Sequence, residues 1–455
     1  MPKVIVTKTF SKLFLKNKLL IIIGKNHCGK PVDSFLKKSN YHFVEYLYLF
    51  FNTITMTSKI THHTFLFLSI ILFTFSCSKQ EKNDDGVLKV NKNGIPVLHP
   101  LQEEMPKLTS AFINDKKYSV SRYFEKTWSE KNDNVAFLVA KNGQIIYENY
   151  MGYANKRTGE SITKDTPLHI ASVSKVLTST AILMLVDAQK IALSQKVNTI
   201  ITNFPYPDVT IQTLLNHRSG MRNYAYFTGE NGNWDKKETL TNEDIVKVMI
   251  EKNIPLETKT DTHFSYCNTN YAMLALVIEK VTGLKYPEAM KQMIFQPLGM
   301  TDTFVFDITK DRDLIAPSYK GNNVEIGIDY LDGIYGDKNI YSTPRDLLKF
   351  DKARYAPFFL NPELIKKIYT GYSHESKGIR NYGLGIRMTE FEKGEPFYYH
   401  NGWWHGNTSS FINLRKEKVT IIVLSNKYTH KTYQTKKLAS LFGDYPFKLD
   451  DDGEE

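Results

Sequence analysis

The chain has 455 residues, of which 42% are apolar, so it can form one large domain or two to three smaller ones around a substantial core. Its net charge of +11 is unevenly spread: residues 1–77 hold ten Lys and Arg against two acidic residues, whereas the remainder holds 49 against 46. The near balance over most of the chain argues against a nucleic-acid partner.

Residues 56–77 are typical of an export signal. A lead containing Lys59 is followed by an apolar run from Phe65 to Phe75 and then by Cys77. The run is too short to span a bilayer and fits the hydrophobic part of a secretory signal. The ending resembles a bacterial lipoprotein signal, which predicts that Cys77 is the lipidated first residue of the mature protein. The alternative is a buried hydrophobic helix at the start of a soluble protein.

On the first interpretation the protein is exported and anchored by lipid in a bacterial cell envelope, on the periplasmic or outer-membrane face. Met56 is then the natural start, and residues 1–55 are a non-native upstream extension. Of the three cysteines only Cys267 lies beyond the signal, so the exported part has no intramolecular disulfide. Membrane contact is expected through the Cys77 lipid.

The next segments are expected in this order. Residues 78–105 are polar and charged without a helical or strand period, which predicts a flexible tether. Residues 118–128 have helical spacing, and Asn142-Gly143 between two strand-like runs indicates a hairpin. A helix that is apolar nearly all round follows Ser172.

Residues 190–350 are expected to form mainly helices and loops, including a helix over 271–281 capped by Gly283. The segment 223–241 is either a mobile loop over a pocket or a plain surface loop. The expected later elements are strands at 384–390, 396–400, 408–414 and 419–424, a closing helix at 432–442 and an acidic tail at 443–455. Strands at both ends with helices between them predict an α/β (α+β) fold, with an antiparallel sheet formed from both ends of the domain, flanked by helices and holding an inserted helical region.

Ser172 and Lys175 are three residues apart at the head of the apolar helix, so they share one helical face. The amine can then reach the hydroxyl and take its proton, which is the geometry of an activated nucleophile. Burial disfavours the charged lysine and so favours a neutral amine that can act as a base. The same spacing occurs twice elsewhere in the chain. The alternative is that Ser172 only caps the helix and Lys175 extends to water.

Three short motifs stand in order along the chain: Ser172-x-x-Lys175, Tyr266-x-Asn268 and His400-x-Gly402. Their order and spacing resemble the serine β-lactamase and penicillin-binding-protein family, in its class C β-lactamase, D-alanyl-D-alanine carboxypeptidase and esterase branch. The resemblance covers roughly residues 107–442, and it implies a β-lactamase/DD-peptidase-like fold for a serine hydrolase domain at 106–442.

The resemblance also implies an acyl-enzyme mechanism. Ser172 attacks a carbonyl carbon, Lys175 accepts the serine proton, and Tyr266 returns it to the leaving group. Asn268 positions Lys175 and the amide of the substrate. The oxyanion hole is implied at the backbone N–H groups of Ser172 and Trp403.

His400 and Gly402 are then assigned to substrate binding. His400 stands where the lactamase and peptidase members commonly carry a lysine, and a histidine is largely neutral at pH 7. We therefore expect uncharged esters or amides to be handled better than β-lactams, and acidification toward pH 6 to help substrates that carry a carboxylate.

The predicted partner is a small-molecule or peptide substrate: a D-alanyl peptide, a β-lactam or an ester. The alternative is a catalytically silent member of the family that binds peptidoglycan or peptide at the cell envelope. The histidines lack the spacing of metal ligands, so no metal and no other cofactor is predicted. The residues do not indicate an oligomeric state.

Overall fold

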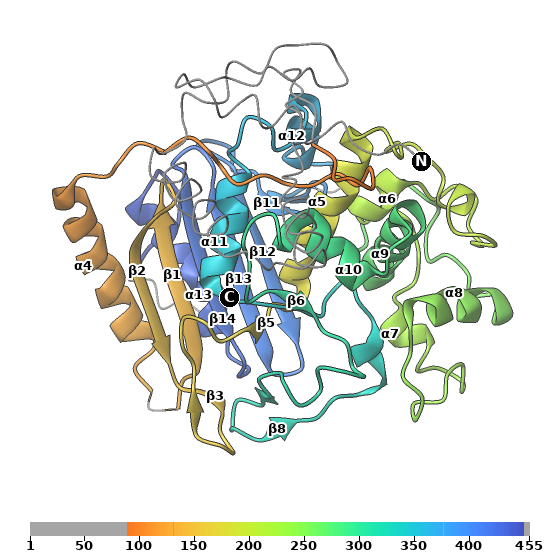
Figure 1. The fold of residues 1–455 in the computed structure, drawn as a ribbon, viewed down its shortest axis with the longest axis horizontal. Coiled ribbons are helices and arrows are strands. Elements are labelled where there is room, and N and C mark those ends of the chain that lie inside the picture. Colours follow the sequence, from red (N-terminus) through yellow and green to blue (C-terminus); the bar gives the residue numbers. More distant parts are fainter. Residues whose placement is uncertain (1–88, 131, 376, 450–455) are drawn as a thin grey trace, which may run out of the picture. The chain divides into compact units, whose positions relative to one another are not determined.

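A computed structural model of the chain describes residues 89–130, 132–375 and 377–449 (Figure 1). The predictions for residues 1–77, Cys77 included, lie outside the described residues. The same holds for the first part of the expected tether and for the end of the tail.

The helices are α4 (Ser110–Thr127), α5 (Ser174–Asp187), α6 (Ile211–Leu215), α7 (Tyr224–Phe227), α8 (Asn242–Glu251), α9 (Asn268–Thr282), α10 (Tyr286–Met290), α11 (Pro344–Ala353), α12 (Pro362–Ile368) and α13 (Lys431–Gln434). Short turns of tighter or wider helix are η1 (Ala171–Val173), η2 (Val197–Thr199), η3 (Lys291–Phe295), η4 (Tyr330–Gly333) and η5 (Thr435–Leu441).

The strands are β1 (Val135–Lys141), β2 (Gln144–Met151), β3 (Tyr153–Asn155), β4 (Glu160–Ser161), β5 (Leu168–His169), β6 (Phe304–Val305), β7 (Ser318–Tyr319), β8 (Glu325–Ile326), β9 (Ile340–Ser342), β10 (Arg380–Tyr382), β11 (Arg387–Thr389), β12 (Phe397–Trp404), β13 (Asn407–Leu414) and β14 (Val419–Ser425).

The main sheet joins the two ends of the domain, as predicted. Its seven strands run in the order β10-β11-β12-β13-β14-β1-β2, and each neighbouring pair is antiparallel. β1 and β2 meet at Asn142 and Gly143, which have φ of 51° and 68°. Two successive positive φ values are typical of a tight hairpin turn, so the hairpin predicted from Asn142-Gly143 is confirmed.

The alternation of side chains along the strands separates two apolar layers. On one face, Phe137 of β1 and Ile421 of β14 pack with Phe124 of α4 and Leu438 of η5. On the other face, residues such as Leu138 join a larger core that contains α5 and α9. Figure 1 shows α4 beside β1 and β2, with the helices α5 to α10 gathered beyond the opposite part of the sheet.

α5 is buried all round except at its C-terminal end, which agrees with its apolar sequence. It packs against α9, which ends at Gly283 with a φ of 70°, the left-handed cap expected there. The segment 223–241 is not a plain surface loop, because it forms α7 and buries Tyr224 and Phe227.

Three expected boundaries were wrong. The distal part of the tether is packed, since Leu98 is fully buried and its N–H donates to Met293 O at 2.9 Å. The strand predicted at 384–390 is shorter, β11, and it pairs with a further short strand, β10, that precedes the predicted range. The start of the tail is also packed, with Phe447 against Phe397 at a centroid distance of 4.9 Å. In the tether and in the tail, a few apolar residues within polar sequence pack into the core.

In the part of the chain that the structure describes, no helix has both the length and the apolar composition needed for a membrane crossing.

Candidate active site

Ser172 lies in the turn η1, directly before α5, and is partly exposed. The preceding residue, Ala171, has a φ of 48°, in the left-handed region that L side chains rarely adopt. Its N–H donates to His169 Nδ1 at 3.0 Å, and Ser409 Oγ donates to Ile170 O at 2.6 Å. The strained turn is therefore held from two sides. Backbone N–H groups in the first turn of a helix lack intrahelical acceptors, which leaves the Ser172 N–H available as an oxyanion donor.

Lys175 is fully buried in the first turn of α5. Its Nζ lies 3.2 Å from Ser172 Oγ and donates to the backbone carbonyl of Asp337 at 2.8 Å. It also lies 5.1 Å from the centroid of the Tyr266 ring. The alternative in which this lysine extends to water is therefore wrong, because the amine points at the serine hydroxyl.

A small sheet brings the Asp337 carbonyl to this amine. Its strands have the order β5-β9-β6, and β5 runs directly into the turn that carries Ser172. The Ile170 N–H donates to Ile340 O at 2.9 Å, next to the pairing of β5 with β9. Asp337 lies just before β9, so this pairing fixes it beside the head of α5.

Gly402 is required by the close approach of β12 to the serine turn. A Cβ at this position would lie 2.2 Å from Ser409 Oγ, 2.6 Å from Ile170 O and 3.0 Å from Ala171 Cβ. Real Cβ atoms do not come this close to backbone oxygen. The motif glycine is thus explained by packing, and it sets the spacing between the serine turn and the β12 edge.

Tyr266 lies opposite Lys175, and its buried hydroxyl has no hydrogen-bond partner among the described residues. The guanidinium of Arg387, on β11, stands over the other part of the site with Cζ 4.4 Å from the centroid of the Tyr266 ring. Burial raises the pKa of the Tyr266 phenol, but the nearby charges of Lys175 and Arg387 outweigh it, so the pKa lies below its usual value. Such a phenol gives up its proton more readily and can take part in proton transfer.

His400 is buried, and its two ring nitrogens are already engaged. Nδ1 lies 2.8 Å from Asn401 O and Nε2 lies 3.0 Å from Tyr382 Oη. Because a carbonyl only accepts, Nδ1 carries the proton and Nε2 accepts from the tyrosine. Burial, with the charges of Arg387 and Lys175, holds the pKa of His400 well below its usual value.

Two details of the His400 prediction therefore need correction. The imidazole is neutral as expected, but it does not offer a free donor to a substrate. Acidification toward pH 6 also leaves it neutral, so the expected gain for substrates with a carboxylate does not follow from this residue.

Asn268 begins α9 next to Tyr266, but it makes no hydrogen bond with Lys175, and its buried Oδ1 is unpaired. The predicted positioning of Lys175 is made instead by the Asp337 carbonyl. His217 also faces Tyr266, with ring centroids 4.4 Å apart, and its buried Nε2 is unpaired. These unpaired atoms gather on the Tyr266 side of the site.

Trp403 follows Gly402 in β12, so its backbone N–H lies on the strand that passes the serine turn. Its indole is 63% exposed and contacts Tyr428, with ring centroids 6.2 Å apart. Trp404 turns the other way, and its Nε1 donates to Asp332 Oδ1 at 2.6 Å.

Sequence patterns missed Asp337 and Arg387. Asp337 acts through its backbone carbonyl, which gives no signal in the residue type. Arg387 had a usable signal, since it is a charged residue that follows the apolar run of Leu384 and Ile386 into a strand. Three side chains of types that can ligate a metal, Asp329, Asp332 and His405, also come together among the described residues. Both carboxylates there already accept hydrogen bonds as the reciprocal cap of η4.

Residues 120–441 match the Beta-lactamase family. The chain belongs to this family. It is 28% identical to penicillin-binding protein 4* of Bacillus subtilis over 340 residues, which cover 70% of this chain and 74% of that protein. It is 25% identical to a D-aminopeptidase of Brucella anthropi over 65% of this chain and 56% of that enzyme. A penicillin-binding protein from Bacillus halodurans has the same fold, with a TM-score of 0.62 and 22% identity over 71% of this chain and 99% of that one.

The predicted fold and the predicted enzyme class are thereby confirmed. This member of the Beta-lactamase family is a serine hydrolase with an α/β architecture. The roles of Ser172, Lys175, Tyr266 and the other individual residues remain predictions, supported by the geometry above.

Proposed function

We propose that this hydrolase works through an acyl-enzyme on Ser172 and prefers substrates that carry a carboxylate beside the scissile acyl group, as in a D-alanyl peptide or a β-lactam. The observation that carries the preference is Arg387, a cation of the site with no carboxylate of the described residues within ion-pair distance. The name of one relative, a penicillin-binding protein, fits this class of substrate, because penicillin carries such a carboxylate.

The chemistry follows from the contacts. The Ser172 hydroxyl attacks the carbonyl carbon while the pair of Lys175 and Tyr266, with the amine 3.2 Å from the hydroxyl, accepts its proton. Tyr266, whose pKa is lowered, exchanges the proton with Lys175 and passes it to the leaving group. The N–H groups of Ser172 and Trp403 stabilise the oxyanion. Water then cleaves the ester on Ser172, with Tyr266 accepting the proton of the water and the Lys175–Tyr266 pair returning it to Ser172 Oγ.

Arg387 supplies the positive charge that His400 lacks. A guanidinium is always charged and binds a carboxylate through two parallel hydrogen bonds. This reverses the sequence-based expectation that uncharged substrates are handled better, because that expectation rested on a neutral His400 alone.

The test compares acetyl-D-alanyl-D-alanine with its C-terminal amide in wild type, Arg387→Met and Arg387→Lys. We expect wild type to prefer the free acid and Arg387→Met to lose about ten- to hundredfold of that preference, as for a hydrogen bond to a charged group. Arg387→Lys should lie between them. Taking the ratio of the two substrates cancels any effect on Tyr266. Equal rates for acid and amide in wild type would contradict the preference. The absence of both turnover and covalent labelling in wild type would favour the catalytically silent family member.

We also propose export and a lipid anchor on Cys77, supported by the short apolar run before it. Metabolic labelling with a clickable fatty acid is expected to mark wild type and to miss Cys77→Ala. Equal labelling of the two proteins would rule the anchor out.

A further inference from the structure

The peptide group that binds Lys175 is held by an unusual buried arrangement of charges. The carbonyl oxygen that accepts from Lys175 belongs to the peptide bond between Asp337 and Lys338. Both of these charged side chains are buried, with 1% and 2% of their surface exposed. Burying two charges is costly and seldom adds stability over apolar side chains, so stability alone does not account for the pair.

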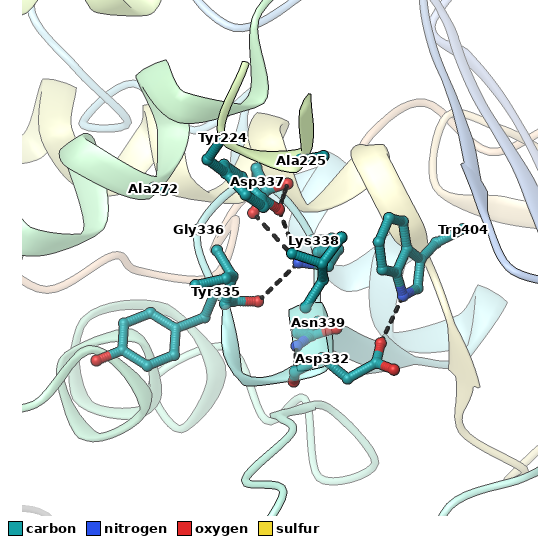
Figure 2. A network of polar contacts seen from close by, with 12 residues as sticks. Tyr224, Ala225, Ala272, Asp332, Tyr335, Gly336, Asp337, Lys338, Asn339 and Trp404 are labelled. Atoms are coloured by element: carbon teal, nitrogen blue, oxygen red, sulfur yellow. Dashed lines mark hydrogen bonds and ion pairs between the residues drawn. The ribbon is translucent and has the colours of Figure 1, made fainter. Parts of the chain in front are cut away.

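Tyr224 joins the two side chains (Figure 2). Its hydroxyl donates to Asp337 Oδ2 at 2.9 Å and accepts from Lys338 Nζ at 2.8 Å. The two charged groups are themselves 3.9 Å apart. The residues on both sides of one peptide group are thus tied to a single phenol, which prevents that peptide group from rotating.

The backbone before this peptide is equally fixed. Gly336 has a φ of 95°, and a Cβ there would lie 2.4 Å from Tyr271 O in α9. Its carbonyl accepts from Thr178 Oγ1 at 2.7 Å, one turn beyond Lys175 on α5. Two neighbouring carbonyls of one segment therefore bind the same face of α5.

Lys338 also reaches the opposite wall of the site. Its Nζ lies 4.6 Å from the centroid of the Trp404 ring, within the range of a cation–π interaction. Trp404 is fixed further by its bond to Asp332, which Figure 2 shows beside Lys338. Trp404 follows Trp403, the residue whose N–H is assigned to the oxyanion hole. One buried cation therefore contacts the segment that holds the base and the strand that carries the oxyanion donor.

We infer that Lys338, paired with Asp337 through Tyr224, is a positioning residue that sets the place of the Lys175 amine relative to Ser172 and the β12 edge. It touches neither substrate nor reacting atoms. This inference rests on the proposed function only in taking Lys175 as the base. A change of about 1 Å in such a position can lower a rate about 100-fold.

The experiment measures the acylation rate of Ser172 with a penicillin or a fluorophosphonate, by intact mass, together with kcat, KM and stability to urea. Lys338→Met keeps the side-chain length and its packing on Trp404 but removes the charge. We expect the acylation rate and kcat to fall about 10- to 100-fold, with KM changed less than about threefold. The matched control is Lys427→Met, since Lys427 is another buried lysine whose Nζ donates to a distant backbone carbonyl, that of Asn132, at 3.0 Å.

A second variant guards against simple unfolding. Lys338→Met leaves the Asp337 charge unpaired and destabilises the fold, whereas Lys338→Met combined with Asp337→Asn removes both charges. We expect the double variant to regain stability to urea but not the acylation rate. Recovery of both, or equal rate losses in Lys338→Met and Lys427→Met, would overturn the inference. Failure of the proposed function looks different, because wild type itself would then remain unlabelled.

Discussion

The two sides of the site differ in how completely their polar groups are paired. On the lysine side, defined by Lys175, Asp337, Lys338 and Tyr224, amines, phenol and carbonyl bind one another, and only one carboxylate oxygen of Asp337 lacks a hydrogen bond. On the tyrosine side, defined by Tyr266, Asn268, His217 and Arg387, three buried polar atoms have no partner. Unpaired buried groups are costly, so we expect a substrate or water to complete the hydrogen bonding on the tyrosine side. The polar groups of the lysine side are already paired within the protein, whereas those of the tyrosine side are left for a ligand.

The largest expected effect comes from the residue between the two sides. Ser172→Ala should lower turnover by at least about 10³-fold, because no covalent intermediate can form. Intact mass after treatment with a fluorophosphonate or a penicillin should show one adduct on wild type and none on the variant. An adduct that is still found on Ser172→Ala would place the nucleophile elsewhere. The lysine side and the tyrosine side would then not be two sides of the active site.

A smaller effect is expected from Gly402, which sets the distance between β12 and the turn that carries Ser172. Gly402→Ala pushes β12 away from the serine turn, because the new Cβ would overlap Ser409 Oγ and Ile170 O. We expect a loss of about 1–3 kcal/mol in urea unfolding and a fall in kcat of up to about 100-fold. Gly327→Ala is the matched control, since no atom lies within 4 Å of its Cβ position. Wild-type activity in Gly402→Ala would show that the spacing is adjustable.

The smallest effect at working pH concerns two buried histidines, His217 of the tyrosine side and His400, whose ring centroid is 6.4 Å from that of Tyr266. Burial lowers the pKa of His217 and of His400 well below the usual value of 6.5. Above pH 6.5 both are neutral folded or unfolded and contribute nothing to the pH dependence. Below pH 6.5 the two histidines bind protons in the unfolded chain but not in the folded chain. The free energy of unfolding therefore falls with falling pH by about 1.4 kcal/mol per pH unit for each histidine.

Urea unfolding at pH 7.5, 6.0 and 5.0 measures this slope. His400→Gln should reduce the slope of unfolding free energy against pH by the contribution of one histidine. Lys338→Met should leave that slope unchanged. An identical slope in wild type and His400→Gln would mean that this imidazole is protonated in the folded protein and that the tyrosine side is more polar than its contacts suggest.

Local patterns predicted what depends on local geometry. Helical spacing brought Lys175 to Ser172, and the Asn142-Gly143 turn fixed the first hairpin. Patterns failed where a role belongs to the backbone or to long-range packing. The Asp337 carbonyl could replace Asn268 as the partner of Lys175 because any residue type supplies a carbonyl. Likewise, the burial of Leu98 could not be predicted, because it is an apolar residue in a mainly polar segment and depends on a core formed by distant parts of the chain.

The pairing of β1 with β14 also bears on the order of folding. Ala136 lies opposite Leu424, so the first strands cannot be completed until nearly the whole chain has been made. Contacts between residues so distant in sequence form slowly, because the loop between them must close first. The edge of β1 that pairs with β14 has no partner until β14 has been made. Until its last strands have been made, such a chain depends on protection from aggregation.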